Sequence, residues 1–178
     1  MLIDIVDEDD NVIGQKGKDE AHRDGDMHRV SHVWVINSKK ELLCHKRADC
    51  KNIFPGKWDV IVGGHLEAGE GYEDAALREV EEEIGIRFSE DDMIFLGKWK
   101  GEFRYNGSEI KEISKSFMIA YDGGIETMRM NIDEISELKF ISIDELKTIS
   151  KDPEKSKNFI TFKTFNEFIE KLFNLNCF

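Results

Sequence analysis

The chain has 178 residues, the length of one domain with a substantial core. A formal net charge of -12 argues against a nucleic-acid partner, because broad binding to phosphates needs a basic face. Three cysteines are too few for a disulfide framework, no apolar stretch reaches the length of a membrane span, and the acidic N-terminus lacks the basic region of a signal peptide. These features predict one domain over residues 1–178, in the cytoplasm and without a membrane partner.

The N-terminal part of the chain is predicted to be rich in strands. Residues 2–14 are typical of two short strands around an acidic turn. Residues 15–28 are polar and contain glycine, which predicts a loop. The runs HVWVIN (32–37) and ELLCHKR (41–47) are rich in strand-forming residues, and we expect them to form a hairpin around Asn-Ser-Lys-Lys.

The middle of the chain contains the clearest helix. The sequence FPGKW (54–58) predicts a turn, and DVIVGG (59–64) predicts the strand that follows it. We expect a helix from about Tyr72 to Ile84, ending at Gly85, which is a favourable C-terminal cap.

The C-terminal part is predicted to add an antiparallel strand pair and two helices. The pair comprises MIFLGKWKGEFRY (93–105) and ISKSFMIAYDG (113–123). Residues 137–150 predict a strand that enters a helix, with Ser142 as the N-cap. Apolar residues at helical spacing predict a packing helix at about 158–175. Strands interleaved with helices indicate one mixed α/β domain.

The central helix concentrates carboxylates on one arc. At about 100° per residue, Glu79, Glu82 and Glu83 lie within about 100° of each other, beside the apolar stripe of Ala76 and Val80. Like charges on one helix repel, so such a cluster indicates a bound divalent cation. Ligands that are all oxygen atoms favour Mg²⁺ or Mn²⁺. The simpler alternative is a solvated helix with excess Glu.

The sequence around this helix resembles a known family motif. Residues 64–86 match the Nudix box, GX5EX7REUXEEXGU with U a bulky aliphatic residue, at every fixed position. The resemblance implies a Nudix α/β/α sandwich with a mixed central sheet. It also implies hydrolysis of a nucleoside diphosphate linked to another moiety, with a small-molecule diphosphate as the substrate.

The same resemblance implies roles for individual residues. Glu79, Glu82 and Glu83 would be metal ligands, together with the carbonyl of Gly63. Arg78 would orient a carboxylate. Glu70 would stabilise the junction of loop and helix.

Other residues are candidates for catalysis and substrate binding. Proteins of this family often supply one more Glu after the box, and Glu112 is the first choice, with Glu109 second, as a metal ligand or general base. Lys46 and Arg47 end a strand that leads to the site in this architecture, where an Arg would bind a diphosphate bidentately. Both are equally explained as surface charges. His65, in the box loop, is a candidate contact with metal or substrate.

Residues 3–90 also look like the Nudix branch related to type 1 isopentenyl diphosphate isomerase. That enzyme moves a double bond by proton transfer and uses a Cys immediately before a Gly-His pair. Here the position is Gly63, so isomerase is the alternative function and hydrolase is favoured. The oligomeric state stays open, although Nudix proteins commonly form homodimers.

The branch resemblance also concerns three histidines. In the isomerase, histidines near the positions of His22, His28 and His65 help to bind a metal. The spacing from His22 to His28 is one residue shorter here than the resemblance leads us to expect. Surface or hydrogen-bonding roles are therefore the favoured interpretation for these side chains.

Overall fold

The computed structural model describes residues 1–161, which divide into two compact units. The expectation of one domain over the whole chain stays a prediction. The first unit comprises Met1–Val33, Gly63–Glu82 and Ile86–Met118. The second comprises Trp34–Val62, Glu83–Gly85 and, within the described part, residues 119–161.

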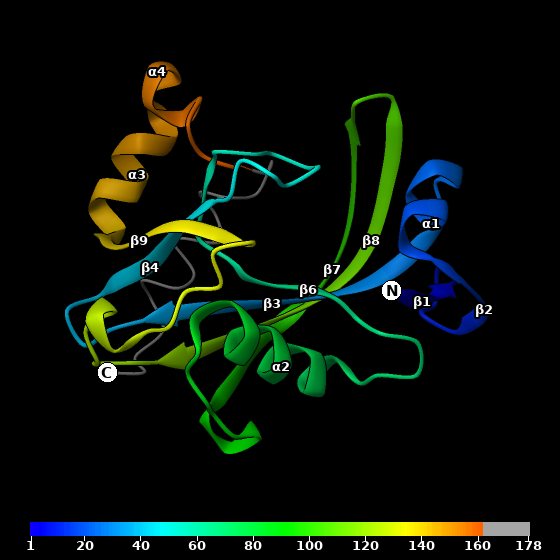
Figure 1. The fold of residues 1–178 in the computed structure, drawn as a ribbon, viewed down its shortest axis with the longest axis horizontal. Coiled ribbons are helices and arrows are strands. Elements are labelled where there is room, and N and C mark those ends of the chain that lie inside the picture. Colours follow the sequence, from blue (N-terminus) through cyan, green and yellow to red (C-terminus); the bar gives the residue numbers. More distant parts are fainter. Residues whose placement is uncertain (162–178) are drawn as a thin grey trace. The chain divides into compact units, whose positions relative to one another are not determined.

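The N-terminal segment of the first unit is a β-hairpin followed by a short helix (Figure 1). Strand β1 (Leu2–Val6) pairs antiparallel with β2 (Val12–Gly17) and also with β3 (Met27–Ile36). The two expected strands around an acidic turn are thereby confirmed. Helix α1 (Lys18–Asp24) occupies part of the segment that was expected to be a loop, so that expectation is wrong.

The rest of the first unit supplies the central helix and a long strand pair. Strand β6 (Val62–His65) pairs with β3 and leads through a loop to α2 (Tyr72–Ile84). Strands β7 (Met93–Tyr105) and β8 (Ser108–Ala120) pair with each other, and β8 also pairs with β3. The bounds of α2 and the pairing of the two long strands confirm both predictions.

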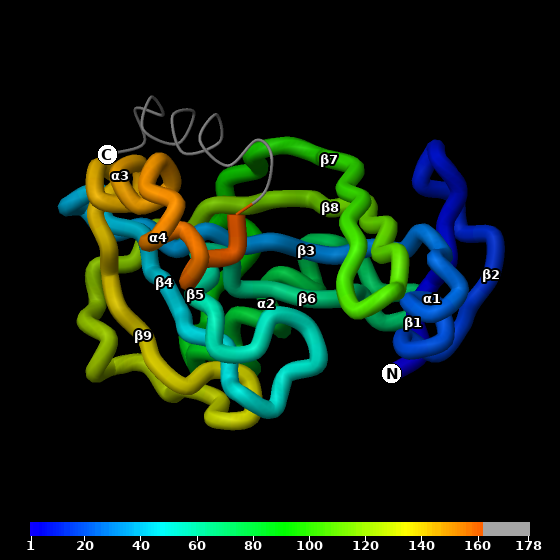
Figure 2. Tube along the Cα trace, turned by 90° about the horizontal axis from the view of Figure 1, so that it is seen from above, coloured from blue at the N-terminus to red at the C-terminus, as the bar shows by residue number. Residues whose placement is uncertain are grey.

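The second unit is built on the pairing of two strands from distant parts of the chain. Strand β4 (Glu41–Arg47) pairs antiparallel with β9 (Ile135–Ser142), and the two run side by side in Figure 2. The two-residue strand β5 (Trp58–Asp59) covers the other edge of β4. Helices α3 (Ile143–Lys151) and α4 (Pro153–Ser156) follow β9. Two single-turn 3₁₀ helices complete the described elements, at Glu90–Asp92 in the first unit and at Ile125–Thr127 in the second.

Local hydrogen bonds explain where several of these elements begin. The hydroxyl of Ser142 accepts a hydrogen bond from the Glu145 backbone N–H at 3.2 Å, which confirms Ser142 as the N-cap of α3. The carboxylate of Asp59 accepts from the backbone N–H groups of Val60 and Ile61. This turn separates β5 from β6, where the sequence predicted one continuous strand.

The helix predicted at about 158–175 is wrong in its first residues. Residues 158–161 are not helical, because the Trp58 carbonyl accepts a hydrogen bond from Ile160 N–H at 2.8 Å and Phe159 forms a parallel bridge with Trp58. The remainder of the prediction, residues 162–175, lies outside the described residues. Within residues 1–161, no helix is long and apolar enough to cross a membrane.

The end of α2 gives the first testable prediction. Gly85 has φ 72°, and an added Cβ would lie 2.7 Å from the Cβ of Arg129. We expect Gly85→Ala to lower the free energy of unfolding by about 1–3 kcal/mol, because left-handed backbone strain and overlap both oppose the side chain. Urea unfolding followed by circular dichroism measures the change. Gly101→Ala is the control, since its Cβ would meet no atom within 4 Å.

Candidate active site

Helix α2 carries the predicted metal ligands and buries an apolar stripe beside them. Ala76, Val80 and Ile84 are fully buried, as the apolar stripe of the sequence predicted. The side chain of Glu79 is 12% exposed, whereas that of Glu82 is 57% exposed. Glu83, one residue further along the same helix, is 7% exposed, so this helix buries acidic side chains as well as apolar ones.

Arg78 binds three acidic residues of the box, all in the first unit. Its guanidinium donates to both oxygens of Glu70, from Nε at 2.8 Å and Nη2 at 2.9 Å. Nη1 donates to Glu79 at 2.8 Å and to Glu82 at 3.2 Å. Nη2 also donates to the backbone carbonyl of His65 at 3.1 Å. One planar side chain therefore fixes the loop and the helix relative to each other.

The electrostatics of this network favour the ionised forms. The hydrogen bonds that Arg78 donates to Glu70 raise the pKa of Arg78 above its usual value, although burial opposes this shift. Burial acts to raise the pKa of Glu70, but the hydrogen bonds from Arg78 outweigh it and the pKa is lowered. Glu70 also accepts a hydrogen bond from the backbone N–H of Glu67 at 2.8 Å. The loop before α2 is thus held by a carboxylate that stays charged at neutral pH.

The glycines before the loop allow close approach of the backbone. Gly63 has φ 147°, and a Cβ added there would overlap the carbonyl oxygen of Ser31. A Cβ on Gly64 would lie 2.7 Å from a carboxylate oxygen of Glu79. Any side chain at residue 63 would displace the backbone of β6 from β3, and one at residue 64 would displace the Glu79 carboxylate.

A contact that the sequence analysis missed anchors the box loop. The carboxylate of Asp4 accepts a hydrogen bond from the Gly69 backbone N–H at 2.9 Å, and Ala68 N–H donates to the Leu2 carbonyl at 3.0 Å. Asp4 is only 4% exposed. Short-range sequence patterns do not indicate a contact between residues 65 positions apart. The one sequence signal for the Asp4–Gly69 contact is an aspartate within an otherwise apolar strand.

Lys46 and Arg47 lie in the second unit, at the end of β4. Lys46 pairs with Trp58 across the sheet, and its carbonyl accepts a hydrogen bond from Ser136. Arg47 donates from Nε to the carbonyl of Ile53 at 3.0 Å, which holds the loop between β4 and β5. Both residues have a structural role in that unit, and their binding of a diphosphate stays a prediction.

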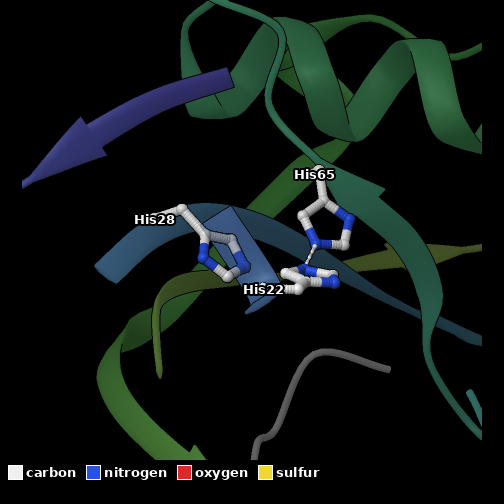
Figure 3. Close-up of side chains that lie close together, drawn as sticks. All are labelled: His22, His28 and His65. Carbon is white, nitrogen blue, oxygen red and sulfur yellow. Dashed lines mark hydrogen bonds between the residues drawn. The ribbon is translucent and has the colours of Figure 1, made fainter. Parts of the chain in front are cut away.

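Three histidines form a compact cluster in the first unit (Figure 3). His22 comes from α1, His28 from β3 and His65 from β6. One ring nitrogen from each lies within 4.8 Å of the others, and the Nε2 atoms of His22 and His65 are 2.9 Å apart. The ring centroids are 4.9 to 5.0 Å apart. Such an arrangement can hold a metal ion.

Of the two roles favoured for these histidines, a surface position does not apply to His28, which is 0% exposed, whereas a hydrogen-bonding role does, since its Nδ1 lies 3.0 Å from the Asp26 carbonyl oxygen. Burial lowers the pKa of His28 to about 4 and also lowers the pKa values of His22 and His65. The rings are therefore neutral at pH 7 and keep a lone pair available for a ligand bond. The sequence spacing did not show that the three rings lie together, because they come from three separate elements.

Glu112 lies on β8 beside this cluster. Its Oε1 is 3.8 Å from Nε2 of His28, and its side chain is 19% exposed. Burial raises the pKa of Glu112 to about 7. Glu109, the second choice, instead forms ion pairs with Arg104 and Lys111 near the end of the same strand. Of the two, only Glu112 approaches a group that can bind metal.

Comparison with known proteins agrees with the motif. Residues 26–162 match the family model described as the NUDIX domain. An uncharacterized Nudix hydrolase of Clostridium acetobutylicum is 34% identical over 148 residues, which is 82% of this chain and 71% of that protein. Isopentenyl-diphosphate Delta-isomerase 1 of Photorhabdus laumondii is 32% identical over 144 residues, 80% of each chain. The chain spans about half the length of some other curated relatives, 46% and 51% in two cases.

The fold comparison points the same way. A crystal structure of a Deinococcus radiodurans protein superposes with a TM-score of 0.71 at 23% identity, over 96% of this chain and 98% of that one. The fold is the α/β fold of Nudix proteins, with a mixed sheet. The chain belongs to the Nudix family, and within it to a branch that includes a relative named as an isomerase.

The Arg78 network gives a second prediction. We expect Arg78→Lys to lower the free energy of unfolding by about 2 kcal/mol, because an ammonium group cannot replace the fork that binds Glu70 and the His65 carbonyl. Arg87→Lys is the matched control. Arg87 is 83% exposed and forms an ion pair with the exposed Glu81, so we expect a change below about 0.5 kcal/mol. Equal urea midpoints for both variants would contradict the role assigned to Arg78.

The pKa of Glu112 gives a third prediction, for protein held in EDTA. Burial raises this pKa from 4.5 to about 7. The folded protein therefore retains a proton that the unfolded chain releases, and stability falls as the pH rises through that window. Relative to wild type, Glu112→Gln should gain about 1–3 kcal/mol of stability between pH 4.5 and pH 8.

Urea unfolding at both pH values measures this gain. Glu109→Gln is the control, because ion pairing lowers the pKa of Glu109 and its removal cannot give a gain of this sign. A stability difference between wild type and Glu112→Gln that stays constant across the window would contradict the burial of a protonated carboxyl.

Proposed function

We propose that the protein is a Mg²⁺-dependent (or Mn²⁺-dependent) pyrophosphohydrolase that cleaves a phosphoanhydride bond in a small diphosphate-containing metabolite. The observation that carries the proposal is the shared contact of Glu79 and Glu82 with one nitrogen of Arg78, at 2.8 and 3.2 Å. Two carboxylates that reach the same atom lie close enough together to bind the same cation. Glu83 follows on the same helix, one turn after Glu79.

The donor set fits a hard divalent cation. The three side chains offer oxygen atoms only, and Mg²⁺ and Mn²⁺ prefer carboxylate and water ligands. The absence of a Cβ at Gly64 leaves room for the Glu79 carboxylate. The backbone carbonyl of Gly63 adds an uncharged oxygen to the proposed set. Arg78 offsets the repulsion between the carboxylates and so keeps them together.

The proposed mechanism divides the work among residues of this chain. Glu79, Glu82 and Glu83 hold the cation, and Arg78 orients Glu79. When bound, the cation offsets the charge of the substrate phosphates and lowers the pKa of the attacking water. Attack on phosphorus breaks the P–O–P bridge and gives a monophosphate and a second phosphorylated product.

Four further residues have proposed roles around this centre. Glu112, with its pKa raised to about 7, suits a general base at neutral pH, and its position beside His28 equally suits a metal ligand. Lys46 and Arg47 are proposed to bind the diphosphate. His65 is proposed to contact the substrate or a metal.

The isomerase alternative has support from the relative in Photorhabdus laumondii but lacks a required group. The isomerase pattern places a catalytic thiol where this chain has Gly63. The backbone there has φ 147° and is packed against the Ser31 carbonyl, so no side chain fits without displacing a strand. Residues 1–161 contain two thiols. Cys44 is buried and burial raises its pKa, and Cys50 donates a hydrogen bond to the Asp133 carbonyl. Hydrolysis therefore remains the favoured reaction.

The substrate class follows from the family and the branch. Nucleoside diphosphate derivatives are proposed first, and prenyl diphosphates second because of the resemblance to the isomerase branch. A location in the cytoplasm and a homodimeric state also stay predictions. Specificity in such folds depends on loops.

The metal ligands give the fourth prediction. We expect Glu82→Gln and Glu83→Gln to lower the rate of hydrolysis at least about tenfold, because each removes a charged metal ligand. The assay incubates the protein with Mg²⁺ and a panel of nucleotide and prenyl diphosphates and measures released phosphate and monophosphate. Glu81→Gln is the control on the same helix, since Glu81 pairs with the exposed Arg87. Isomerised product without phosphate release would overturn the proposal.

A further inference from the structure

The N-terminal hairpin of β1 and β2 contacts the loop that opens the Nudix box. This loop, residues 66–71, connects β6 to α2 and extends toward the hairpin in Figure 1. The hairpin precedes residues 26–162, which match the family model, so its contacts are additional to those of the matched region. Two of its carboxylates are largely shielded from water, since Asp4 is 4% exposed and the side chain of Asp10 is 9% exposed.

Asp4 holds the middle of the loop and uses both of its carboxylate oxygens. Oδ2 accepts a hydrogen bond from the Gly69 backbone N–H at 2.9 Å, and Oδ1 accepts one from the Gln15 side chain at 2.9 Å. The donor to Oδ2 lies in the loop, whereas the donor to Oδ1 lies in β2. An amide at this position would therefore direct an NH₂ group toward one of two donors.

Asp10 holds the start of α2. The hydroxyl of Tyr72, the first residue of this helix, donates to the two carboxylate oxygens of Asp10 at 3.2 and 3.1 Å. Arg29 donates to Oδ1 at 2.6 Å, and Lys98 forms an ion pair with Oδ2 at 2.5 Å. The Arg29 carbonyl also accepts a hydrogen bond from Leu66 N–H, at the first residue of the loop, at 3.2 Å. One carboxylate thus connects the hairpin to groups at both ends of the loop.

The backbone of Asp10 shows that its carboxylate has a specific use. Its φ of 68° lies in the left-handed region, where glycine is the least strained residue. Burial acts to raise the pKa of Asp10, but hydrogen bonds from Lys98 and Arg29 outweigh it and the pKa is lowered. The carboxylate therefore stays ionised at neutral pH, and its contacts with α2, β3 and β7 offset the backbone cost.

The hairpin holds the chain on both sides of Glu70. Gly69 is fixed by one carboxylate of the hairpin and Tyr72 by the other. Between them, Glu70 accepts hydrogen bonds from Arg78 at 2.8 and 2.9 Å. Arg78 in turn donates to Glu79 at 2.8 Å. The position of the hairpin therefore affects the orientation of a proposed metal ligand.

We propose that the N-terminal hairpin, residues 1–17, positions the metal ligands of the Nudix box, with Asp4 and Asp10 as its positioning residues. This inference rests on the proposed function of the box. The two aspartates act on Glu79 through the loop, Glu70 and Arg78, and not as ligands. Displacement of the loop would turn the guanidinium away from Glu79 and so weaken the binding of a cation.

Binding of Mn²⁺ to full-length protein, followed by electron paramagnetic resonance of the free ion, tests this role. We expect Asp4→Asn and Asp10→Asn each to weaken Mn²⁺ binding about threefold or more, because an amide cannot accept from all of the surrounding donors. Tyr72→Phe should also weaken it. This variant keeps the buried ring and loses only the hydroxyl, so it tests the contact even if Asp10→Asn does not fold.

Glu8→Gln is the matched control. Glu8 lies in the same hairpin, is 75% exposed and pairs with Lys100 on β7, so we expect the wild-type Mn²⁺ affinity. Circular dichroism verifies that each variant is folded at the temperature of the measurement. Wild-type Mn²⁺ affinity in folded Asp4→Asn and Tyr72→Phe would overturn the proposal.

A double-mutant cycle tests the route through the guanidinium. In an Arg78→Lys background, Asp4→Asn should change the Mn²⁺ affinity by a smaller factor than in wild type, because the link from Glu70 to Glu79 is already broken. Equal factors in the two backgrounds would contradict this route.

Hydrogen–deuterium exchange without added metal separates this inference from the proposed function. We expect the backbone amides of residues 66–72 to exchange at least about fivefold faster in Asp4→Asn than in Glu8→Gln. Equal rates would overturn the role of the hairpin while leaving the proposed hydrolysis intact. Faster exchange in Asp4→Asn, together with wild-type protein that binds no Mn²⁺, would instead overturn the proposed function and the positioning of metal ligands.

Discussion

The proposed site depends on one guanidinium group. Arg78 is 22% exposed and connects Glu70, Glu79, Glu82 and the His65 carbonyl. Its positive charge offsets the repulsion that adjacent carboxylates create on one helix. Its planar geometry also fixes the direction of two of these carboxylates, which a lysine cannot do. The acidic helix is therefore stable and ordered through a side chain of the same motif.

The two glycines of β6 set which chemistry the site can support. At Gly63 the strand packs so closely on β3 that a side chain would overlap the Ser31 carbonyl. This packing leaves no place for the thiol that an isomerase of the related branch needs. At Gly64 the same absence of a Cβ admits a carboxylate. Close backbone packing at these two glycines thus agrees with the proposed hydrolytic reaction and opposes a thiol at residue 63.

The sequence predicted what short-range patterns encode. Helical spacing and a capping glycine gave both ends of α2 correctly, and alternating strand-forming residues gave the long strand pairs. Helix α1 was missed because its seven residues are mostly polar and bury only Ala21. The break between β5 and β6 was missed because a single side chain, Asp59, creates it. The Asp4 contact with Gly69 and the histidine cluster depend on tertiary packing, which local patterns do not contain.

The isomerase pattern combines a catalytic thiol with a group of histidines. This chain lacks the thiol but keeps the histidines. His28 is buried and its Nε2 atom has no hydrogen-bond partner within residues 1–161, while His22 and His65 beside it are partly buried. Replacement by apolar residues would remove this cost, so the rings need a compensating interaction. A metal ion, such as the isomerase resemblance implies for these positions, would supply one, since it would satisfy several lone pairs at once. Because His65 also carries the carbonyl that binds Arg78, the same interaction would stabilise the backbone beside the proposed hydrolytic centre.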